Sequence, residues 1–95
     1  MTYTAFLKEL KQFRGLFRLE GSFIRHKQRD SGKGYCPLAA VNVARGGSDT
    51  YCVDFLPQRV CDTIACAADG ELTSARRRAI RKDLLRVLGL QEVKA

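Results

Sequence analysis

His26 and Cys36 are the residues whose types could form a catalytic pair, since a thiolate beside an imidazole is a common enzymatic nucleophile. They flank a turn-forming segment centred near Ser31, so a tight hairpin would place them almost opposite each other. Opposite residues on neighbouring strands approach about 4.5–5.5 Å between Cβ atoms, but a shift of one residue sends the side chains to opposite faces. No third group that would orient the imidazole follows from the sequence. We therefore expect no enzymatic activity, with a small Cys/His enzyme as an alternative.

The Gly32-Lys33-Gly34 triplet invites comparison with a phosphate-binding loop. That motif needs a glycine five positions before its second glycine and a Ser or Thr after its lysine, whereas this chain has Lys27 and Gly34 there. One histidine, scattered aspartates and the lack of a Cys-x2-Cys pair argue against a metal site. A four-cysteine zinc site assembled from distant loops is the alternative. We expect no cofactor and no metal. The four cysteines are Cys36, Cys52, Cys61 and Cys66.

The charge of the chain is strongly positive, with 17 Lys and Arg against 10 Asp and Glu and a net charge of +7. The excess lies in residues 1–33 and 71–95, whereas residues 34–70 are net acidic. Such clustering favours nucleic acid, an acidic protein or anionic lipid as a partner. No apolar run is long enough to span a membrane, and the N-terminus is amphipathic rather than a signal peptide. Free thiols in the cytoplasm are therefore expected.

The strongest signal for binding is the segment SARRRAIRKDLLR, residues 74–86. With about 100° per residue, Ile80 and Leu84 face inward and a basic face lies opposite. Arginines in the first turn oppose the helix macrodipole, so helix stability does not explain them. Arginine-rich faces neutralise phosphates or meet acidic protein surfaces, although a merely solvated face is the alternative. The candidate partner-binding residues are Arg25, Lys27, Arg29 and Lys33 of a basic hairpin, with Arg76, Arg77, Arg78, Arg81, Lys82 and Arg86 of this helix.

Hydrophobic periodicity predicts the helices that position these residues. Residues 3–14, 57–68 and 74–88 have the apolar spacing of amphipathic helices, and glycines that can end a helix follow them. Residues 37–44 fit a helix that begins at a proline better than a buried strand. Residues 91–95 are expected to be a frayed tail.

Strand signals are shorter and less certain in their pairing. Residues 23–27 predict a strand that returns at residues 35–36, because residues 30–34 form a dense turn signal. Residues 51–55 have strand character, and residues 16–20 are ambiguous. The expected fold is one small α+β domain over residues 1–95. It has an N-terminal helix, a short antiparallel hairpin or small sheet, and two to three further helices.

Three segments, IRHKQRDSGKGYCPLAAV, ACAADG and RRRAIRKDLLRVLGL, are similar to small uncharacterised proteins of bacteriophages and prophages. The resemblance implies a cytoplasmic accessory protein of a bacterial host cell and carries no catalytic residues. Together with the charge pattern, it leads us to expect a non-catalytic module that contacts nucleic acid through the basic helix and hairpin. The alternative is a phage-encoded protein that binds and inhibits a host complex, such as a nuclease-based defence system (anti-CRISPR-like). A homodimer and the sharing of one face by the two basic patches stay open.

Overall fold

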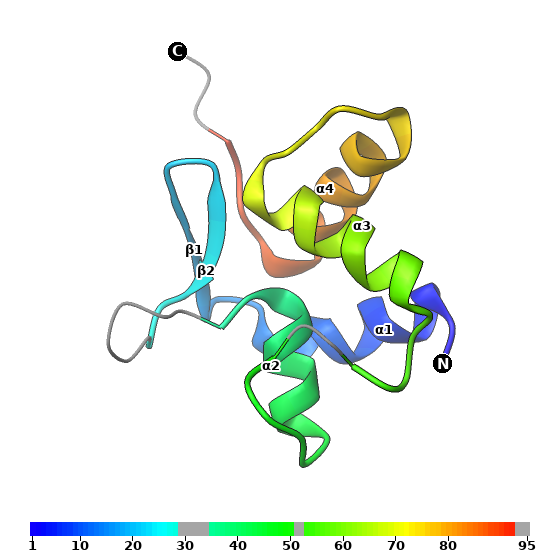
Figure 1. The fold of residues 1–95 in the computed structure, drawn as a ribbon. Helices are drawn as coiled ribbons and strands as arrows, with labels where there is room; N and C mark the ends of the chain where they lie inside the picture. Colours follow the sequence, from blue (N-terminus) through cyan, green and yellow to red (C-terminus); the bar gives the residue numbers. More distant parts are fainter. Residues whose placement is uncertain (29–34, 51–52, 93–95) are drawn as a thin grey trace.

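The computed structural model describes residues 1–28, 35–50 and 53–92 (Figure 1). The first helix, α1, spans Tyr3–Leu10 and continues into a 3-10 turn, η1, at Lys11–Phe13. A β-hairpin follows, and then three more helices. The later elements are β1 (Phe17–Glu20), β2 (Phe23–His26), α2 (Pro37–Ala44), α3 (Gln58–Asp69) and α4 (Ala75–Leu88). The predicted α+β class is confirmed.

Side-chain caps explain where three of the helices begin. The hydroxyl of Thr2 accepts a hydrogen bond from Ala5 N at the start of α1, and Ser74 accepts one from Arg77 N at the start of α4. At α2 the Cys36 thiol takes this role toward Ala39 N, and Pro37 occupies the first turn. Proline is pre-organised for that position and has no N–H to lose. The helix predicted for residues 37–44 is therefore confirmed.

The hairpin differs from the one expected. β1 and β2 pair antiparallel, with Phe17 opposite His26 and Glu20 opposite Phe23, so the connecting turn is Gly21-Ser22. The predicted partner of residues 23–27 was residues 35–36. One backbone bond does run that way, from His26 N to Tyr35 O at 3.1 Å, but the ladder partner is β1. The predicted turn at residues 30–34 lies outside the described part of the chain.

The strand predicted at residues 51–55 is wrong for the residues that can be judged. Val53 is irregular and Asp54–Leu56 form a bend before α3, whereas residues 51 and 52 lie outside the described part. The described sheet holds β1 and β2 only. Val53 is nevertheless buried, so its apolar character reflects packing of a loop into the core.

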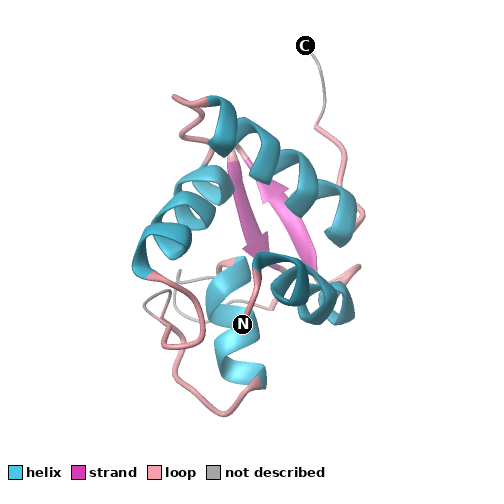
Figure 2. Ribbon diagram, turned by 90° about the vertical axis from the view of Figure 1, so that its right-hand side faces the viewer, coloured by secondary structure: helices cyan, strands magenta, loops and turns pink. Residues whose placement is uncertain are grey.

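The helices gather on one side of the hairpin, as Figure 1 shows, and Figure 2 looks from the helix side with the strands behind. α3 packs against α4, and α1 packs against both α2 and α4. The shared core between these layers contains the buried side chains of Phe6, Leu10, Phe17, Leu38, Ile64, Leu84 and Leu88. Among the described helices, none combines the length and apolar character needed to cross a bilayer.

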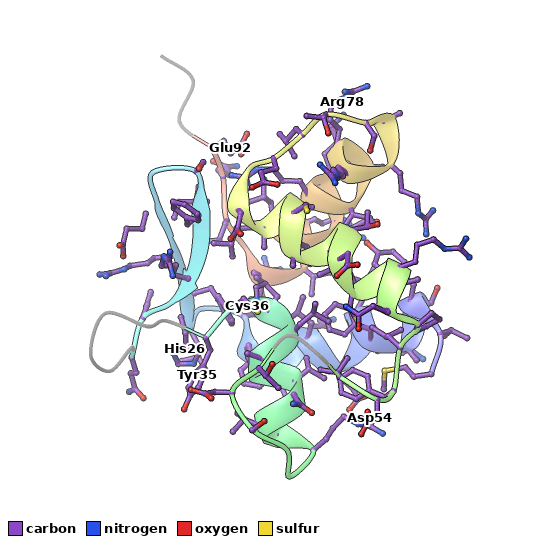
Figure 3. The ribbon with its side chains drawn as sticks, in the orientation of Figure 1. His26, Tyr35, Cys36, Asp54, Arg78 and Glu92 are labelled. Atoms are coloured by element: carbon purple, nitrogen blue, oxygen red, sulfur yellow. The ribbon has the colours of Figure 1, made fainter. Side chains whose placement is uncertain are left out.

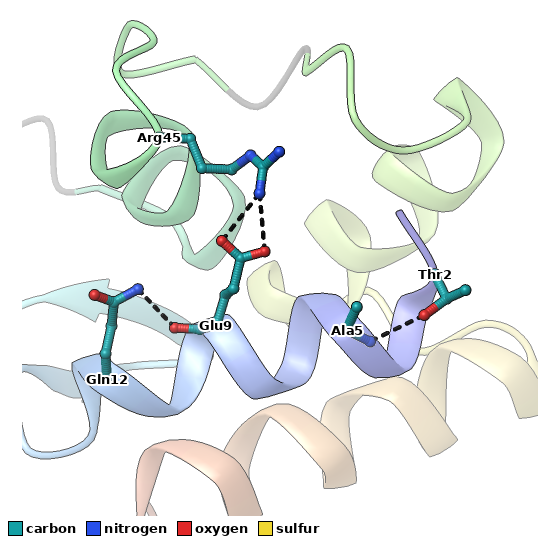
Figure 4. Close-up of polar contacts among 5 residues, drawn as sticks. All are labelled: Thr2, Ala5, Glu9, Gln12 and Arg45. Atoms are coloured by element: carbon teal, nitrogen blue, oxygen red, sulfur yellow. Dashed lines mark hydrogen bonds and ion pairs between the residues drawn. The ribbon is translucent and has the colours of Figure 1, made fainter.

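Polar contacts attach α1 to the start of the loop after α2. Nη1 of Arg45 lies 3.1 and 3.0 Å from the two carboxylate oxygens of Glu9 (Figure 4). The same guanidinium lies over the ring of Phe55, 4.8 Å from its centroid. Arg45 therefore joins α1, the end of α2 and the loop that leads to α3. The Glu9 carbonyl also accepts a hydrogen bond from the side chain of Gln12.

Candidate nucleic-acid interface

Three cations form a row along the outer face of α4. Arg78, Lys82 and Arg86 are all exposed, and their spacing of four residues stacks them along one side of the helix. At 1.5 Å per residue the row extends over about 12 Å. Like charges four residues apart destabilise a helix by roughly 0.2–0.5 kcal/mol per pair. Helix stability therefore does not explain why these residues share a face.

Each end of this row is anchored by a contact within its own neighbourhood. Nη1 of Arg78 donates to the carbonyl of Leu72 at 3.3 Å, which holds the arginine near the connection between α3 and α4. Arg86 pairs with Asp83 at 3.3 Å, but 67% of its side chain stays exposed. Both guanidinium groups keep donors that face solvent and can meet an anion.

Arg81 does not belong to this row, and its predicted place on the exposed face is wrong. Only 4% of the residue is exposed. Its Nη1 donates to the carbonyls of Ala67 and Ala68 at the end of α3, and its Nε pairs with Glu92. Arg81 therefore fixes α4 to α3 rather than facing a partner. Glu92, which falls in the predicted frayed tail, is held by this ion pair.

A second pair of cations lies where the first turn of α4 packs beside the beginning of α3. Arg59 and Arg76, together with Val60 and Thr63, line a shallow hollow of about 370 Å³. The Thr63 hydroxyl is turned inward, donating to the Arg59 carbonyl at 2.9 Å. Sequence reasoning missed Arg59, because an isolated arginine on a helix gives no signal until another helix brings a second cation beside it.

Arg77, also in the first turn of α4, is half-buried and faces the other way. Its Nη1 donates to the Thr73 hydroxyl at 2.8 Å. Its positive charge lies near the thiol of Cys66 and acts to lower the pKa of that thiol, although burial is the larger effect and raises it. Arg77 therefore contributes less to the outer surface than Arg76 and Arg78 do.

The cations of the hairpin contribute less to the exposed basic surface than the sequence predicts. The Arg25 guanidinium lies over the Phe23 ring, 4.6 Å from its centroid, and its Nε is buried without a hydrogen-bond partner. The positive charge of Arg25 also acts on Asp69, where burial and then repulsion from Glu71 raise the carboxyl pKa and Arg25 partly offsets them. Lys27 is exposed. Arg29 and Lys33 lie outside the described residues.

The end of β2 and the first turn of α4 lie in different parts of the molecule. Figure 3 places His26, at the end of β2, near the lower left and Arg78 near the top of the molecule. The Arg86 end of the row lies closer to the hairpin, because the Arg86 carbonyl accepts from Nη1 of Arg14 and the Leu16 carbonyl accepts from Lys27 N. The row lies on α4 alone, whereas residues of both α3 and α4 line the Arg59–Arg76 hollow.

His26 and Cys36 make their hydrogen bonds to other groups. Nδ1 of His26 accepts from Gln28 N at 3.0 Å, and its ring packs edge-on against those of Phe17 and Tyr35. The Cys36 sulfur accepts from Ala39 N at 3.3 Å. Burial raises the pKa of the Cys36 thiol and lowers the pKa of His26. A raised thiol pKa is the opposite of what a cysteine nucleophile needs.

The remaining cysteines and acidic groups do not assemble a metal centre in the described part of the chain. No set of three or more His, Cys, Asp and Glu residues there is arranged to hold a metal ion. Cys36 and Cys66 are free thiols. Cys61 is buried in the core, as expected for a small apolar side chain.

Comparison with known proteins does not assign this chain to a family. No family model, curated protein or solved structure matches this chain. The resemblance to small phage proteins therefore stays a prediction, and the surface itself must carry any argument about function.

Proposed function

We propose that this protein binds nucleic acid through the outer face of α4, without catalysing a reaction. The observation that carries the proposal is the row of exposed cations at Arg78, Lys82 and Arg86. Duplex DNA carries about one negative charge per 1.7 Å of its axis, so a row of about 12 Å spans roughly seven phosphate charges. Two of the three cations are arginines, which hold phosphate oxygens with two parallel hydrogen bonds.

The Arg59–Arg76 hollow supplies a second phosphate contact in this proposal. It lies beside the first turn of α4, whose free backbone N–H groups and positive dipole end also favour an anion. Contacts of this kind position a protein on the backbone of a nucleic acid and read no sequence. We therefore expect affinity that depends strongly on salt and weakly on base sequence.

The proposed setting is the cytoplasm of a cell. Cys36 and Cys66 are free thiols, and such thiols persist in a reducing compartment. An interaction with intracellular nucleic acid requires the same compartment.

Fluorescence anisotropy with a labelled duplex of about 20 base pairs tests the proposal. Binding that neutralises Z phosphates gives a log K against log salt slope of about −0.9Z. The triple variant R78Q/K82Q/R86Q removes three cations, so its slope should be shallower by about 3 and its affinity at low salt lower by at least about tenfold. Circular dichroism checks that α4 remains helical.

A matched variant, K8Q/K11Q/R18Q, removes the same charge from exposed residues of α1, η1 and β1. It should bind nearly as the parent does, apart from a small long-range effect of net charge. Equal losses in the two triple variants, or no binding of DNA or RNA at low salt, would refute the proposal. Nuclease-resistant capture of a host protein through intact α4 residues would support the inhibitor of a host complex instead.

A further inference from the structure

A cleft of about 530 Å³ lies on the side of the molecule where the hairpin turn meets the connection between α3 and α4. It is a different site from the row on α4, because Arg81 lines it and Arg78, Lys82 and Arg86 do not, although Arg78 donates to the carbonyl of the lining residue Leu72. Leucine side chains give it two apolar walls, and the turn contributes backbone and a serine. Its lining residues are Leu19, Gly21, Ser22, Gly70, Leu72 and Arg81, with Glu92 at its edge.

The charge at the base of this cleft is unusually well buried. The Arg81 side chain is only 5% exposed, whereas that of Glu92 is 49% exposed. Nη1 of Arg81 is held by the carbonyls of Ala67 and Ala68, at 2.8 and 3.4 Å, which fixes the guanidinium in place. These carbonyls lie in the last turn of α3, where the helix dipole is negative. The guanidinium therefore presents a preformed site for an anion.

Glu92 supplies the full negative charge that balances Arg81 in this structure. It stands in an irregular segment after α4, and both Gln91 and Glu92 are exposed. Figure 3 shows Glu92 beside the top of the hairpin. Because about half of the Glu92 side chain is exposed, another carboxylate can reach its place from solvent, and the exchange keeps Arg81 neutralised. A buried arginine left without a counter-charge would be strongly unfavourable.

We propose that this cleft is a docking site for an acidic side chain in an extended segment of a partner protein, and that Glu92 is the internal carboxylate that such a segment displaces. An incoming carboxylate keeps the pairing with Arg81. The residues beside that carboxylate in the partner segment can bury apolar surface against Leu19 and Leu72. Both leucines line the cleft and are only partly buried in this structure. This site takes a protein ligand and is independent of the proposed binding of nucleic acid.

The variant E92Q in the full chain tests the proposal, since glutamine keeps the shape of glutamate and removes its charge. The probe is the peptide acetyl-Gln-Glu-Val-Lys-amide, which copies residues 91–94, followed by ¹H–¹⁵N shifts of the Gly21, Gly70 and Leu72 amides. In the parent chain the peptide competes with an internal carboxylate at millimolar effective concentration. We expect its apparent Kd to be about tenfold lower for E92Q than for the parent.

Two controls make the result specific. D54N removes the same charge from an exposed residue at the opposite end of the molecule, and it should behave as the parent does. The peptide acetyl-Gln-Gln-Val-Lys-amide should bind E92Q at least about tenfold more weakly, because a charge-assisted bond becomes a neutral one. Equal Kd values for the three proteins, equal shifts with both peptides, or no shift at about 10 mM peptide would overturn the proposal.

Discussion

At the scale of single residues, His26 is a buried polar side chain enclosed by aromatic rings. It is 8% exposed, and Phe13, Phe17 and Tyr35 all meet it edge-on. Since Nδ1 accepts from Gln28 N, the neutral ring carries its proton on Nε2. Burial lowers the pKa of His26 from its usual value of 6.5, which keeps the ring uncharged near neutral pH.

The free energy of unfolding should therefore fall as the pH falls below about 6.5. Between that value and the lower native pKa, the unfolded chain takes up a proton at residue 26 that the folded chain does not. For one site the slope is at most about 1.4 kcal/mol per pH unit. Urea unfolding at pH 7.5, 6.5 and 5.5 measures it.

The variant H26Q provides the control, because glutamine does not titrate. Its stability will be lower at every pH, but the part of the slope that belongs to residue 26 should vanish. The raised pKa of Asp69 acts with the opposite sign and remains in both proteins, so the difference between them isolates His26. Parallel curves for the parent and H26Q would contradict this account.

At the scale of elements, the hairpin turn at Gly21-Ser22 packs directly against the end of α3 at Gly70. Gly70 ends α3 in the left-handed conformation, with φ of +84°. A Cβ atom there would lie 2.6 Å from Cβ of Ser22 in the hairpin turn, whose hydroxyl donates to the Asp69 carbonyl at 3.0 Å. The close approach seats the hairpin on the end of α3.

We expect G70A to destabilise the protein by about 2–5 kcal/mol. About 1–2 kcal/mol comes from the left-handed backbone and a further 1–3 kcal/mol from the clash with Ser22. The matched variant G46A has a similar φ, +89°, but nothing lies within 4 Å of the added Cβ. Thermal or urea unfolding should thus show a loss of only about 1–2 kcal/mol for G46A. Equal losses would mean that the contact with Ser22 carries no energy.

The elements also show how far the sequence alone could go. Helix stripes such as Ile80 and Leu84 depend on local periodicity, so the helices were predicted close to their observed bounds. The partner of β2 was missed, although Gly21-Ser22 is a pair typical of two-residue hairpins; the longer turn signal at residues 30–34 was preferred.

Arg81 shows why the candidate site was harder to predict than the fold. It lies about 60° from Leu84 around the helix, at the border of the apolar stripe, where a long side chain can turn inward or outward. Its direction is decided by the carbonyls at the end of α3 and by Glu92, which are distant in sequence. The exposed cations Arg78 and Lys82 needed no such partner and were placed correctly.

At the scale of the whole molecule, contacts between distant parts of the chain close the fold around α4. The Tyr3 hydroxyl donates to Asp83 at 2.8 Å, and burial followed by this carboxylate raises the pKa of Tyr3, so the donor proton is retained. Nη1 of Arg14 donates to the carbonyls of Arg86 and Val87 at 3.0 and 3.4 Å. Tyr3 of α1 therefore bonds to the side of α4, and Arg14, just after η1, bonds to the carbonyls at its end.

Removing one of these contacts should cost measurable stability while leaving the basic row intact. Y3F deletes a part-buried hydrogen bond to a carboxylate, and we expect a loss of about 1–2 kcal/mol in the free energy of unfolding. D83N keeps an acceptor for Tyr3 and should lose less. If urea unfolding finds Y3F as stable as the parent, Tyr3 does not hold α1 to α4. DNA affinity should be unchanged in Y3F.

The meeting of Ser22 with Gly70 also constrains how the two positions can vary together among related chains. A side chain at position 70 needs both tolerance of a left-handed backbone and empty space beside it. Asparagine offers the first, and glycine at position 22 would provide the second. Chains that carry asparagine at 70 should therefore carry glycine at 22. Where that pairing occurs in a relative, it would indicate from sequence alone that the hairpin sits on the end of α3 as it does here.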